Sequence, residues 1–357
     1  MRIDQLIPAY HKGDAIGDTA SHLRDFLNSR GFSSQIYCLT RDEELGSESL
    51  PFDSFPEPAP SDITILHFAL PSLMTRAFAE LKSKKVLIYH NITPPKFFLE
   101  VSPEMARICE RGKEELLSLK PHVSIALADS EFNRLELEEL GFRKTAVFPL
   151  FIDFKKYEKP WNPLLFELFR DGRLNVLFVG RVAPNKKIED LIKVIFYYKK
   201  YISPLVRLIV VGKTSSFPVY YRSLIKLADE FYLNSEEICF TGHISDEEMF
   251  AIYRASDIFL SLSEHEGFGL PFLESMIFDL PIIAYECTAV PYTLEGAGVL
   301  LKEKRVEYTA ELLQFIAHNP KLKEEVLNTQ RQRLKKFKEE VLGDVLLKSL
   351  EEFLSEG

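Results

Sequence analysis

The sequence predicts an α/β protein of two doubly wound domains, each built around a mostly parallel sheet. The first observation is length, since 357 residues exceed what one hydrophobic core usually organises and favour two domains of about 150 residues each. The second is that short apolar runs alternate with longer amphipathic stretches, which implies helical crossovers between parallel strands. The third is that the second half of the chain repeats this plan.

In the first half, the predicted strands are apolar runs of only a few residues, rich in Ile, Val and Phe. They cover residues 3–8, 34–39, 63–66, 86–90, 123–127 and 145–149. Apolar residues at helical spacing predict helices between these strands, over residues 18–29, 103–119 and 131–140.

In the second half, the same criteria predict strands over residues 175–179, 207–211, 237–240, 258–262, 281–285 and 298–300. Residues 153–172 contain two prolines and a charge run that interrupt the periodicity, so they are the expected linker. We therefore expect one domain over residues 1–160 and a second over residues 165–335. An apolar stripe between Val341 and Leu354 predicts a closing helix.

Composition excludes several classes of protein. With 46% hydrophobic residues the chain is too apolar to be disordered, and a net charge of −9 gives it no basic excess for nucleic acid. The longest stretch without Asp, Glu, Lys or Arg is residues 63–75, well short of the ~20 that cross a bilayer. The N-terminus lacks the features of a secretory signal, which predicts a cytoplasmic location. The four cysteines are too far apart in sequence for a zinc or redox motif.

One small basic cluster stands out against this acidic background. Lys82, Lys84 and Lys85 can contact an anionic membrane surface or an acidic acceptor. Three lysines near a helix end are more often a solvated face that favours the helix dipole, and this explanation is preferred.

Residues 263–274 (SEHEGFGLPFLE) follow a predicted strand and carry the strongest chemical signal. Gly267 and Gly269 permit a tight turn from strand to helix, and a helix N-terminus after such a loop is an anion site. We expect Glu266, in the loop, and Glu274, one turn into the helix, to lie on either side of the opening of one binding site. Carboxylates accept hydrogen bonds from paired hydroxyls, so a sugar or ribose is the expected ligand. Glu264 and His265 are more simply explained as solvated loop residues.

Residues 176–187 (VLFVGRVAPNKK) also pass from strand to glycine, loop and helix. The carboxyl end of a central strand is where open α/β sheets bind ligands. Arg181 can bind a diphosphate as a fork, and Lys186 can add a point charge. Lys186 and Lys187 could instead face solvent, but the start of a helix is an unfavourable place for cations, so an anionic partner is favoured.

These two motifs resemble retaining glycosyltransferases of the GT-B fold, in particular family 4 of the sequence-based classification. Glu266 and Glu274 stand with seven residues between them, as in that family's E-x7-E motif. The resemblance implies that Arg181 and Lys186 hold the donor diphosphate and that Glu274 holds the donor ribose. It also implies that Glu266 faces the donor sugar, together with the backbone amides of residues 267–270, which are Gly267, Phe268, Gly269 and Leu270.

The resemblance extends to weaker signals. Gly180, the segment around Gly212, and residues 241–246 with Ile244 resemble parts of the family's donor site, although Ser245 and Glu248 also form a complete capping box. His90, at a strand end, matches a histidine placed near the reacting centre.

Gly13 and Gly17 lie in a first loop expected near the acceptor. The family also implies that the closing helix, residues 338–357, packs back on the first domain, and that the two domains face each other across a cleft.

The expected function is therefore retaining transfer of a hexosyl group from a UDP- or GDP-sugar to a saccharide or lipid-linked acceptor in glycan synthesis. No D-x-D triplet occurs, so neither a metal nor another cofactor is expected, and the protein cations would stabilise the leaving diphosphate. Two alternatives stay open: a catalytically silent nucleotide-sugar-binding subunit, and a GT-B phosphorylase that uses inorganic phosphate.

Overall fold

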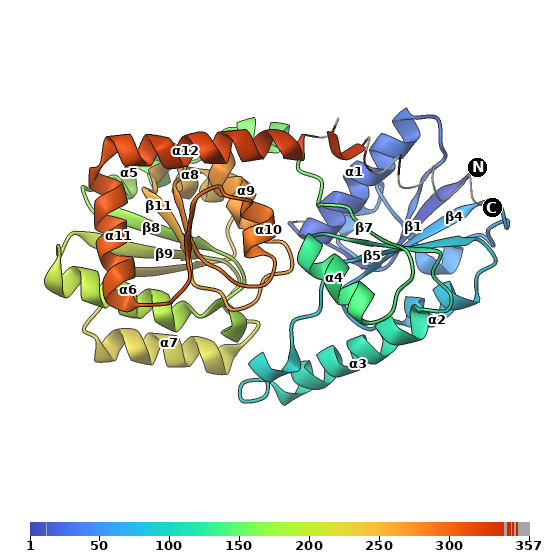
Figure 1. The fold of residues 1–357 in the computed structure, drawn as a ribbon, viewed down its shortest axis with the longest axis horizontal. Coiled ribbons are helices and arrows are strands. Elements are labelled where there is room, and N and C mark those ends of the chain that lie inside the picture. The colour runs from blue at the N-terminus through green and yellow to red at the C-terminus, as the bar shows by residue number, and fades with distance from the viewer. Residues whose placement is uncertain (12, 339–340, 344, 346–347, 349–357) are drawn as a thin grey trace. The chain divides into compact units, whose positions relative to one another are not determined.

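The computed structural model describes residues 1–11, 13–338, 341–343, 345 and 348, and the chain divides into two compact units (Figure 1). Unit 1 contains Met1–Lys96, Pro103–Asp153 and the described residues from Lys336 onward. Unit 2 contains Phe154–Lys335 and also the short segment Phe97–Ser102. The main chain thus leaves unit 1 at the start of the expected linker, and the passage of Phe97–Ser102 into unit 2 has no counterpart in the sequence analysis.

Unit 1 has a seven-stranded parallel sheet in the order β3-β2-β1-β4-β5-β6-β7. The strands are β1 Ile3–Tyr10, β2 Ile36–Arg41, β3 Leu50–Pro51, β4 Ile63–Phe68, β5 Lys84–Tyr89, β6 Ile125–Ala128 and β7 Thr145–Val147. The helices are α1 Ala15–Ser29, α2 Leu73–Glu80, α3 Pro103–Leu119 and α4 Glu131–Glu139, with short 3-10 turns at Glu43–Leu45, Phe52–Ser54 and Pro95–Phe97. Helix α1 covers one face of this sheet, and α2 and α3 lie on the other (Figure 1).

The core of unit 1 forms because alternate residues of each strand point to the same face. On the face under α1, the buried side chains are Ile3, Ile63, Ile65, Val86, Ile88, Ile125 and Leu127, packed against Leu23, Phe26 and Leu27. Leu342 is buried in the same cluster. The rest of the expected closing helix, residues 338–357, lies largely outside the described residues.

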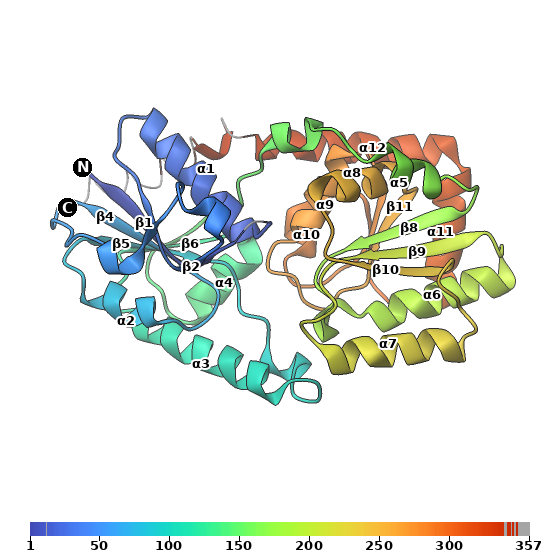
Figure 2. The same ribbon diagram turned by 180° about the vertical axis from the view of Figure 1, so that it is seen from behind.

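Unit 2 has a six-stranded parallel sheet in the order β10-β9-β8-β11-β12-β13 (Figure 2). The strands are β8 Leu174–Val179, β9 Val206–Val211, β10 Ile238–Gly242, β11 Ile258–Ser261, β12 Ile282–Tyr285 and β13 Val299–Leu301. The helices are α5 Pro163–Leu168, α6 Ile188–Tyr201, α7 Pro218–Glu230, α8 Asp246–Ala255, α9 Leu270–Ile277, α10 Val290–Leu294, α11 Val306–His318 and α12 Pro320–Leu334. Two 3-10 turns cover Phe154–Glu158 and Pro184–Lys186, and a third, Lys335–Phe337, begins at the last residue of unit 2 and continues into unit 1.

The prediction of two doubly wound parallel sheets is confirmed, and all twelve predicted strands are present. Strand β3 was not predicted because two residues give no periodic signal. Gly17, expected in a loop, lies in the first turn of α1, since Asp14 caps this helix by accepting a hydrogen bond from the N–H of Ile16. No described helix combines the length and apolar content needed to cross a membrane.

Candidate active site

The loop after β8 begins at Gly180, where strand ends of unit 2 come close together. The N–H of Gly180 donates to the carbonyl of Val211 at 2.9 Å, and the N–H of Gly212 donates to the carbonyl of Gly242 at 3.0 Å. A Cβ on Gly212 would lie 2.0 Å from the carbonyl oxygen of Gly180. Glycine is therefore required at position 212 for β8 and β9 to keep this spacing.

Hydrogen bonds connect the loop after β8 to the loop after β11. Asn185 Nδ2 donates to the carbonyl of His265 at 3.1 Å, and the N–H of Glu264 donates to the carbonyl of Asn185 at 2.8 Å. Thr288 Oγ1 accepts from the N–H of Glu266 at 2.9 Å and donates to its carbonyl at 2.8 Å. The two predicted loops are thus one connected structure at the carboxyl end of the sheet, where such folds bind ligands.

Lys186 and Glu266, predicted from separate motifs, form an ion pair in this structure. The ammonium Nζ lies 2.6 Å from Glu266 Oε2, and the two side chains are only 19% and 11% exposed. Lys186 is therefore not a solvent-facing lysine. Because an ammonium has three N–H donors, the bond to Glu266 leaves donors that can bind a phosphate oxygen.

Arg181 and Lys187 complete the cationic loop in different ways. The side chain of Arg181 is exposed, and no carboxylate within the described part of the chain forms an ion pair with it. Lys187 caps α6 in the left-handed conformation, and its ammonium lies 3.6 Å from both Glu189 and Glu264. Glu264 also pairs with Lys304 at 2.5 Å. Lys187 thus belongs to a surface charge network, whereas Arg181 extends toward solvent.

The turn into α9 depends on Gly269, which has a φ of +88°. A Cβ there would lie 2.5 Å from the ring of Phe272, so a side chain is excluded by space as well as by backbone conformation. Thr293 Oγ1 donates to the carbonyl of Phe268 at 2.6 Å and fixes the preceding loop. Gly267, Gly269 and Leu270 therefore present the N-terminus of α9 beside Glu266, as an anion site requires.

Glu274 differs from its expected place at the mouth of the site because α9 directs it into the interior of unit 2. Its side chain accepts hydrogen bonds from Tyr157 at 3.0 Å and from Tyr253 at 2.8 Å, one on each carboxylate oxygen. The residue is 5% exposed, and burial raises the pKa of its carboxyl. The role in binding ribose stays a prediction. Sequence analysis missed both tyrosines, since no local pattern connects them to Glu274.

Other loop residues have clear structural partners. His265, for which a solvated position was favoured, is buried, and its ring lies 6.1 Å from that of Phe97. The capping box of Ser245 and Glu248 at the start of α8 is confirmed. Ile244 is partly buried just before it. Burial raises the pKa of Cys287 to about 12, so its thiol stays protonated and unreactive at neutral pH.

In unit 1, His90 follows β5 and lies in a hydrogen-bonded chain. Its Nδ1 is 3.0 Å from Asp129 Oδ2, and its Nε2 is 2.9 Å from Nδ1 of His67. The side chain of His90 is 2% exposed, so both ring nitrogens face protein groups. Burial raises the pKa of Asp129 and lowers that of His67 well below its usual range. Sequence analysis did not find His67, whose position in an apolar run gave no sign of a polar partner.

Residues 166–333 match the family described as glycosyl transferases group 1. The chain carries a glycosyl transferases group 1 domain. This domain contains every predicted donor-site residue from Gly180 to Glu274, whereas Gly13, Gly17 and His90 precede it.

The curated relatives of this chain include proteins named as glycosyltransferases and one named as a glycolipid synthase. The serotype-specific mannosyltransferase WbdA of Escherichia coli is 28% identical over 116 residues, 32% of this chain and 14% of WbdA. The alpha-monoglucosyldiacylglycerol synthase of Acholeplasma laidlawii is 27% identical over 155 residues, 43% of this chain and 37% of that protein. The capsular polysaccharide biosynthesis glycosyltransferase CapM of Staphylococcus aureus is 24% identical over 268 residues, 73% of this chain and 67% of CapM. This chain therefore spans only a seventh to two thirds of these relatives.

Solved structures share the fold over nearly the whole chain. Anabaena Alr3699/HepE in complex with UDP and glucose superposes with a TM-score of 0.76 at 17% identity, covering 99% of this chain and all of that one. WaaG, a glycosyltransferase of lipopolysaccharide biosynthesis, gives a TM-score of 0.71 at 13% identity, with 96% and 98% covered. The expected GT-B fold, two Rossmann-like α/β domains, is thereby confirmed.

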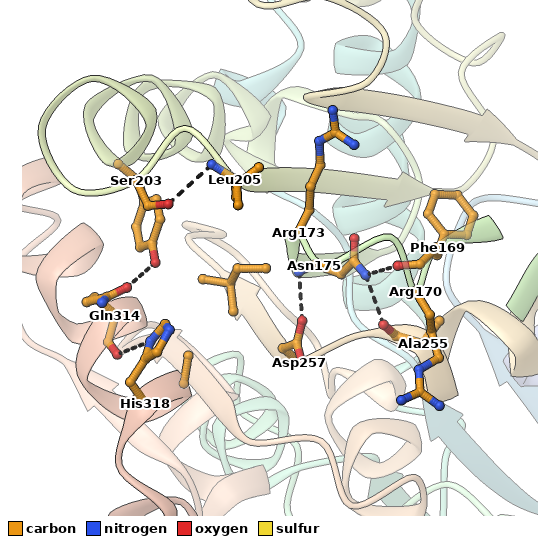
Figure 3. A pocket seen from close by; sticks show the side chains of 14 residues that line it. Phe169, Arg170, Arg173, Asn175, Ser203, Leu205, Ala255, Asp257, Gln314 and His318 are labelled. Atoms are coloured by element: carbon orange, nitrogen blue, oxygen red, sulfur yellow. Dashed lines mark hydrogen bonds between the residues drawn. The ribbon is translucent and has the colours of Figure 1, made fainter. Parts of the chain in front are cut away.

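A pocket of about 450 Å³ lies at the opposite end of the sheet in the glycosyl transferases group 1 domain (Figure 3). It is lined by residues that begin strands or precede them, including Asn175, Leu205 and Asp257. The backbone N–H of Asn175 donates to Asp257 at 2.8 Å, and Tyr198 bonds to Gln314. Since none of the loop residues predicted to bind the donor lines it, this pocket is separate from the candidate active site.

Within the part of the chain that the structure describes, no group of three or more His, Cys, Asp or Glu side chains is placed to hold a metal ion. The polar groups of the candidate site are the ion pair of Lys186 and Glu266, the guanidinium of Arg181 and the backbone amides at the N-terminus of α9.

Proposed function

We propose that the protein is a retaining glycosyltransferase that moves a hexosyl group from a UDP- or GDP-sugar to a saccharide or lipid-linked acceptor. The observation that carries this proposal is the Lys186–Glu266 pair, which lies between two glycine-bearing loops at the carboxyl end of the unit 2 sheet. Membership of residues 166–333 in the glycosyl transferases group 1 family supports it.

In this mechanism the bond between the anomeric carbon and the diphosphate breaks, and negative charge develops on the leaving group. Lys186 and Arg181 stabilise that charge together with the N-terminal amides of α9. Glu266 holds Lys186 in place and faces the donor sugar. The acceptor hydroxyl attacks from the side of the leaving group, so the configuration is retained, and the departing phosphate oxygen takes its proton.

The donor class is supported by the structural neighbours, because Anabaena Alr3699/HepE is solved with UDP and glucose and with UDP-glucose. Names of the curated relatives support a role in glycan synthesis, with both polysaccharide and glycolipid products among them. We further propose membership of family 4 and a reaction that needs no metal, since the protein cations can replace one at the diphosphate. We place the reaction in the cytoplasm, with peripheral contact at the membrane surface when the acceptor is lipid-linked.

The test is a screen of UDP, GDP, UDP-glucose and GDP-mannose for a rise in melting temperature, followed by an assay for released nucleotide with saccharide and glycolipid acceptors. A ligand at 100 times its Kd should stabilise the protein by about 2.7 kcal/mol. Transfer with retained configuration that persists in EDTA supports the proposal. Nucleotide-sugar binding without transfer favours the catalytically silent subunit. Formation of a sugar phosphate when inorganic phosphate is added favours a phosphorylase.

A further inference from the structure

Four polar side chains form a buried row across the unit 1 sheet. Gln5, His67, His90 and Asp129 lie on or directly after β1, β4, β5 and β6, which are neighbours in the sheet. In each strand, the buried alternate residues that precede the polar one on the same face are apolar. In β4, for example, Ile63 and Ile65 precede His67. Since buried polar groups have to be hydrogen-bonded, the protons of this row are determined by its partners.

The orientation of Gln5 fixes the first proton. Its Nε2 lies 3.0 Å from the carbonyl oxygen of Ala20 in α1, and a carbonyl can only accept. The amide group must therefore face Ala20, which leaves Oε1 facing His67 Nε2 at 2.9 Å. Because Oε1 also only accepts, Nε2 of His67 carries the hydrogen.

The second proton follows from the first. His67 is 1% exposed and lies against His90, so the neutral ring is the stable form. A neutral ring protonated at Nε2 has a bare Nδ1, and this atom lies 2.9 Å from Nε2 of His90. The bond between the two histidines forms only if Nε2 of His90 carries a hydrogen.

The third proton lies between His90 and Asp129. Nδ1 of His90 and Oδ2 of Asp129 are 3.0 Å apart, and two bare atoms at this distance would repel each other. One proton therefore occupies this contact, on the nitrogen of an imidazolium or on the oxygen of a carboxylic acid. Within the described residues, Oδ1 of Asp129 is buried without a hydrogen-bond partner, which disfavours a full carboxylate charge.

We propose that Gln5 and His67 are positioning residues for glycosyl transfer: they hold His90 with Nε2 protonated and keep one proton shared between His90 and Asp129. His90 then has no free lone pair and does not act as a general base. This inference rests on the proposed function. It agrees with a reaction in which the proton of the acceptor hydroxyl passes to the departing phosphate oxygen.

The backbone next to His90 supports a functional role for this strand end. Asn91 has a φ of +72°, which is uncommon for a residue with a side chain. On the other side of the strand, Tyr89 donates to Glu136 at 2.9 Å and Asn91 Nδ2 donates to Asn133 at 2.9 Å. Strained backbone positions that are fixed by side-chain hydrogen bonds are typical of functional sites. His90 lies between Tyr89 and Asn91, whose side chains are both fixed by hydrogen bonds.

The proton assignment is tested by NMR of the full-length protein labelled with ¹⁵N at its eight histidines. His67→Asn and His90→Gln identify the two ring signals by their loss. Between pH 6 and 8 we expect His67 to be neutral with hydrogen on Nε2, and His90 to keep hydrogen on Nε2 throughout. A bare Nε2 on His90 at any pH in this range would overturn the inference.

Function is tested by turnover, measured as UDP released from UDP-glucose or GDP from GDP-mannose. His67→Leu leaves His90 Nε2–H without an acceptor and should lower kcat at least about tenfold, equal to about 1.4 kcal/mol, with KM unchanged. His67→Asn keeps an acceptor near the position of Nδ1 and should restore most of that loss. His122→Leu, at an exposed histidine, is the control. Wild-type kcat in His67→Leu, or no rescue by asparagine, contradicts the inference.

The two proposals fail in different ways. If neither donor supports turnover with any acceptor, the proposed function fails, while the NMR result still decides the proton assignment. If transfer is robust but NMR shows a bare Nε2 on His90, or His67→Leu keeps wild-type kcat, the protein is a transferase and the positioning role is wrong.

Discussion

Lys186 and Glu266 lie 80 residues apart in sequence and 2.6 Å apart in the structure. We expect Lys186→Ala to lower kcat by about 10² to 10³, equal to about 2.7–4 kcal/mol, because a fixed charge at the leaving group is lost. Lys187→Asn is the matched control, since its ammonium belongs to the surface network. Nucleotide release under saturating donor is the measurement. Equal losses in the two variants would contradict the assigned role of Lys186.

Glu274 offers a test of stability rather than catalysis. Removing its carboxylate in Glu274→Ala leaves two buried tyrosine hydroxyls without an acceptor, each costing about 1–3 kcal/mol. Glu274→Gln keeps one carbonyl oxygen and should cost much less. Urea unfolding of the two variants beside wild type measures the difference. If alanine and glutamine were equally tolerated, Glu274 would not hold these elements together.

His67 predicts a dependence of stability on pH. Its pKa is lower in the folded than in the unfolded protein, where it is near 6.5, so its contribution is present above that pH and lost as pH falls below it. From pH 7.5 to 5.5 we expect wild type to lose about 1 kcal/mol more than His67→Asn. Asp129, whose pKa is raised, acts in the opposite direction in both proteins. Urea unfolding at the two pH values gives the comparison.

At the residue scale, the sequence predicted the site residues that belong to a local motif. It missed the residues that become neighbours only when the chain folds. Lys186, Glu266 and the glycines follow strand ends in recognisable order. Tyr157 and Tyr253 are 117 and 21 residues from Glu274, and Gln5 is 62 residues from His67. Such pairs depend on helix packing and strand order, which no local pattern encodes.

Among the elements, the ends of β8 and β9 are the most constrained. Gly212→Ala places a Cβ 2.0 Å from a backbone oxygen that cannot move without breaking the sheet. We expect loss of about 3 kcal/mol or more, or no folded protein. Gly172→Ala is the matched control, because its φ is +88° but its Cβ would meet nothing within 4 Å. It should cost only about 1–2 kcal/mol, measured by urea unfolding.

Strands of three or more residues were predictable because buried parallel strands form short apolar runs between polar stretches. Helix α3 was predicted with its observed bounds, Pro103–Leu119, since it begins with proline and keeps helical spacing. The start of α1 was placed three residues late because Gly17 has low helix propensity. The hydrogen bond from the N–H of Ile16 to the capping side chain of Asp14 and the burial of Gly17 outweigh that low propensity.

The whole molecule is less simply divided than the sequence indicates. Unit 2 includes Phe97–Ser102, where Phe98 stacks on Phe217 with ring centroids 5.1 Å apart. It also includes Phe154–Glu158, where Tyr157 packs against Phe250 and Phe278 and donates to Glu274. Fragments cut at the sequence-predicted boundary of residue 165 therefore remove part of the core of unit 2.

This division predicts that a fragment of residues 154–335 is more stable than one of residues 165–335. Tyr157 contributes about 1.5–3 kcal/mol by burial of its ring and a similar amount by its bond to a carboxylate. For about 180 residues, each kcal/mol shifts Tm by about 2–4 °C, so the combined contribution of about 3–6 kcal/mol should make the longer fragment melt about 6–24 °C higher. Tyr157→Phe in the longer fragment keeps the ring, loses the hydroxyl and should melt between the two. Equal melting temperatures for the two fragments would show that unit 2 ends where the sequence predicted.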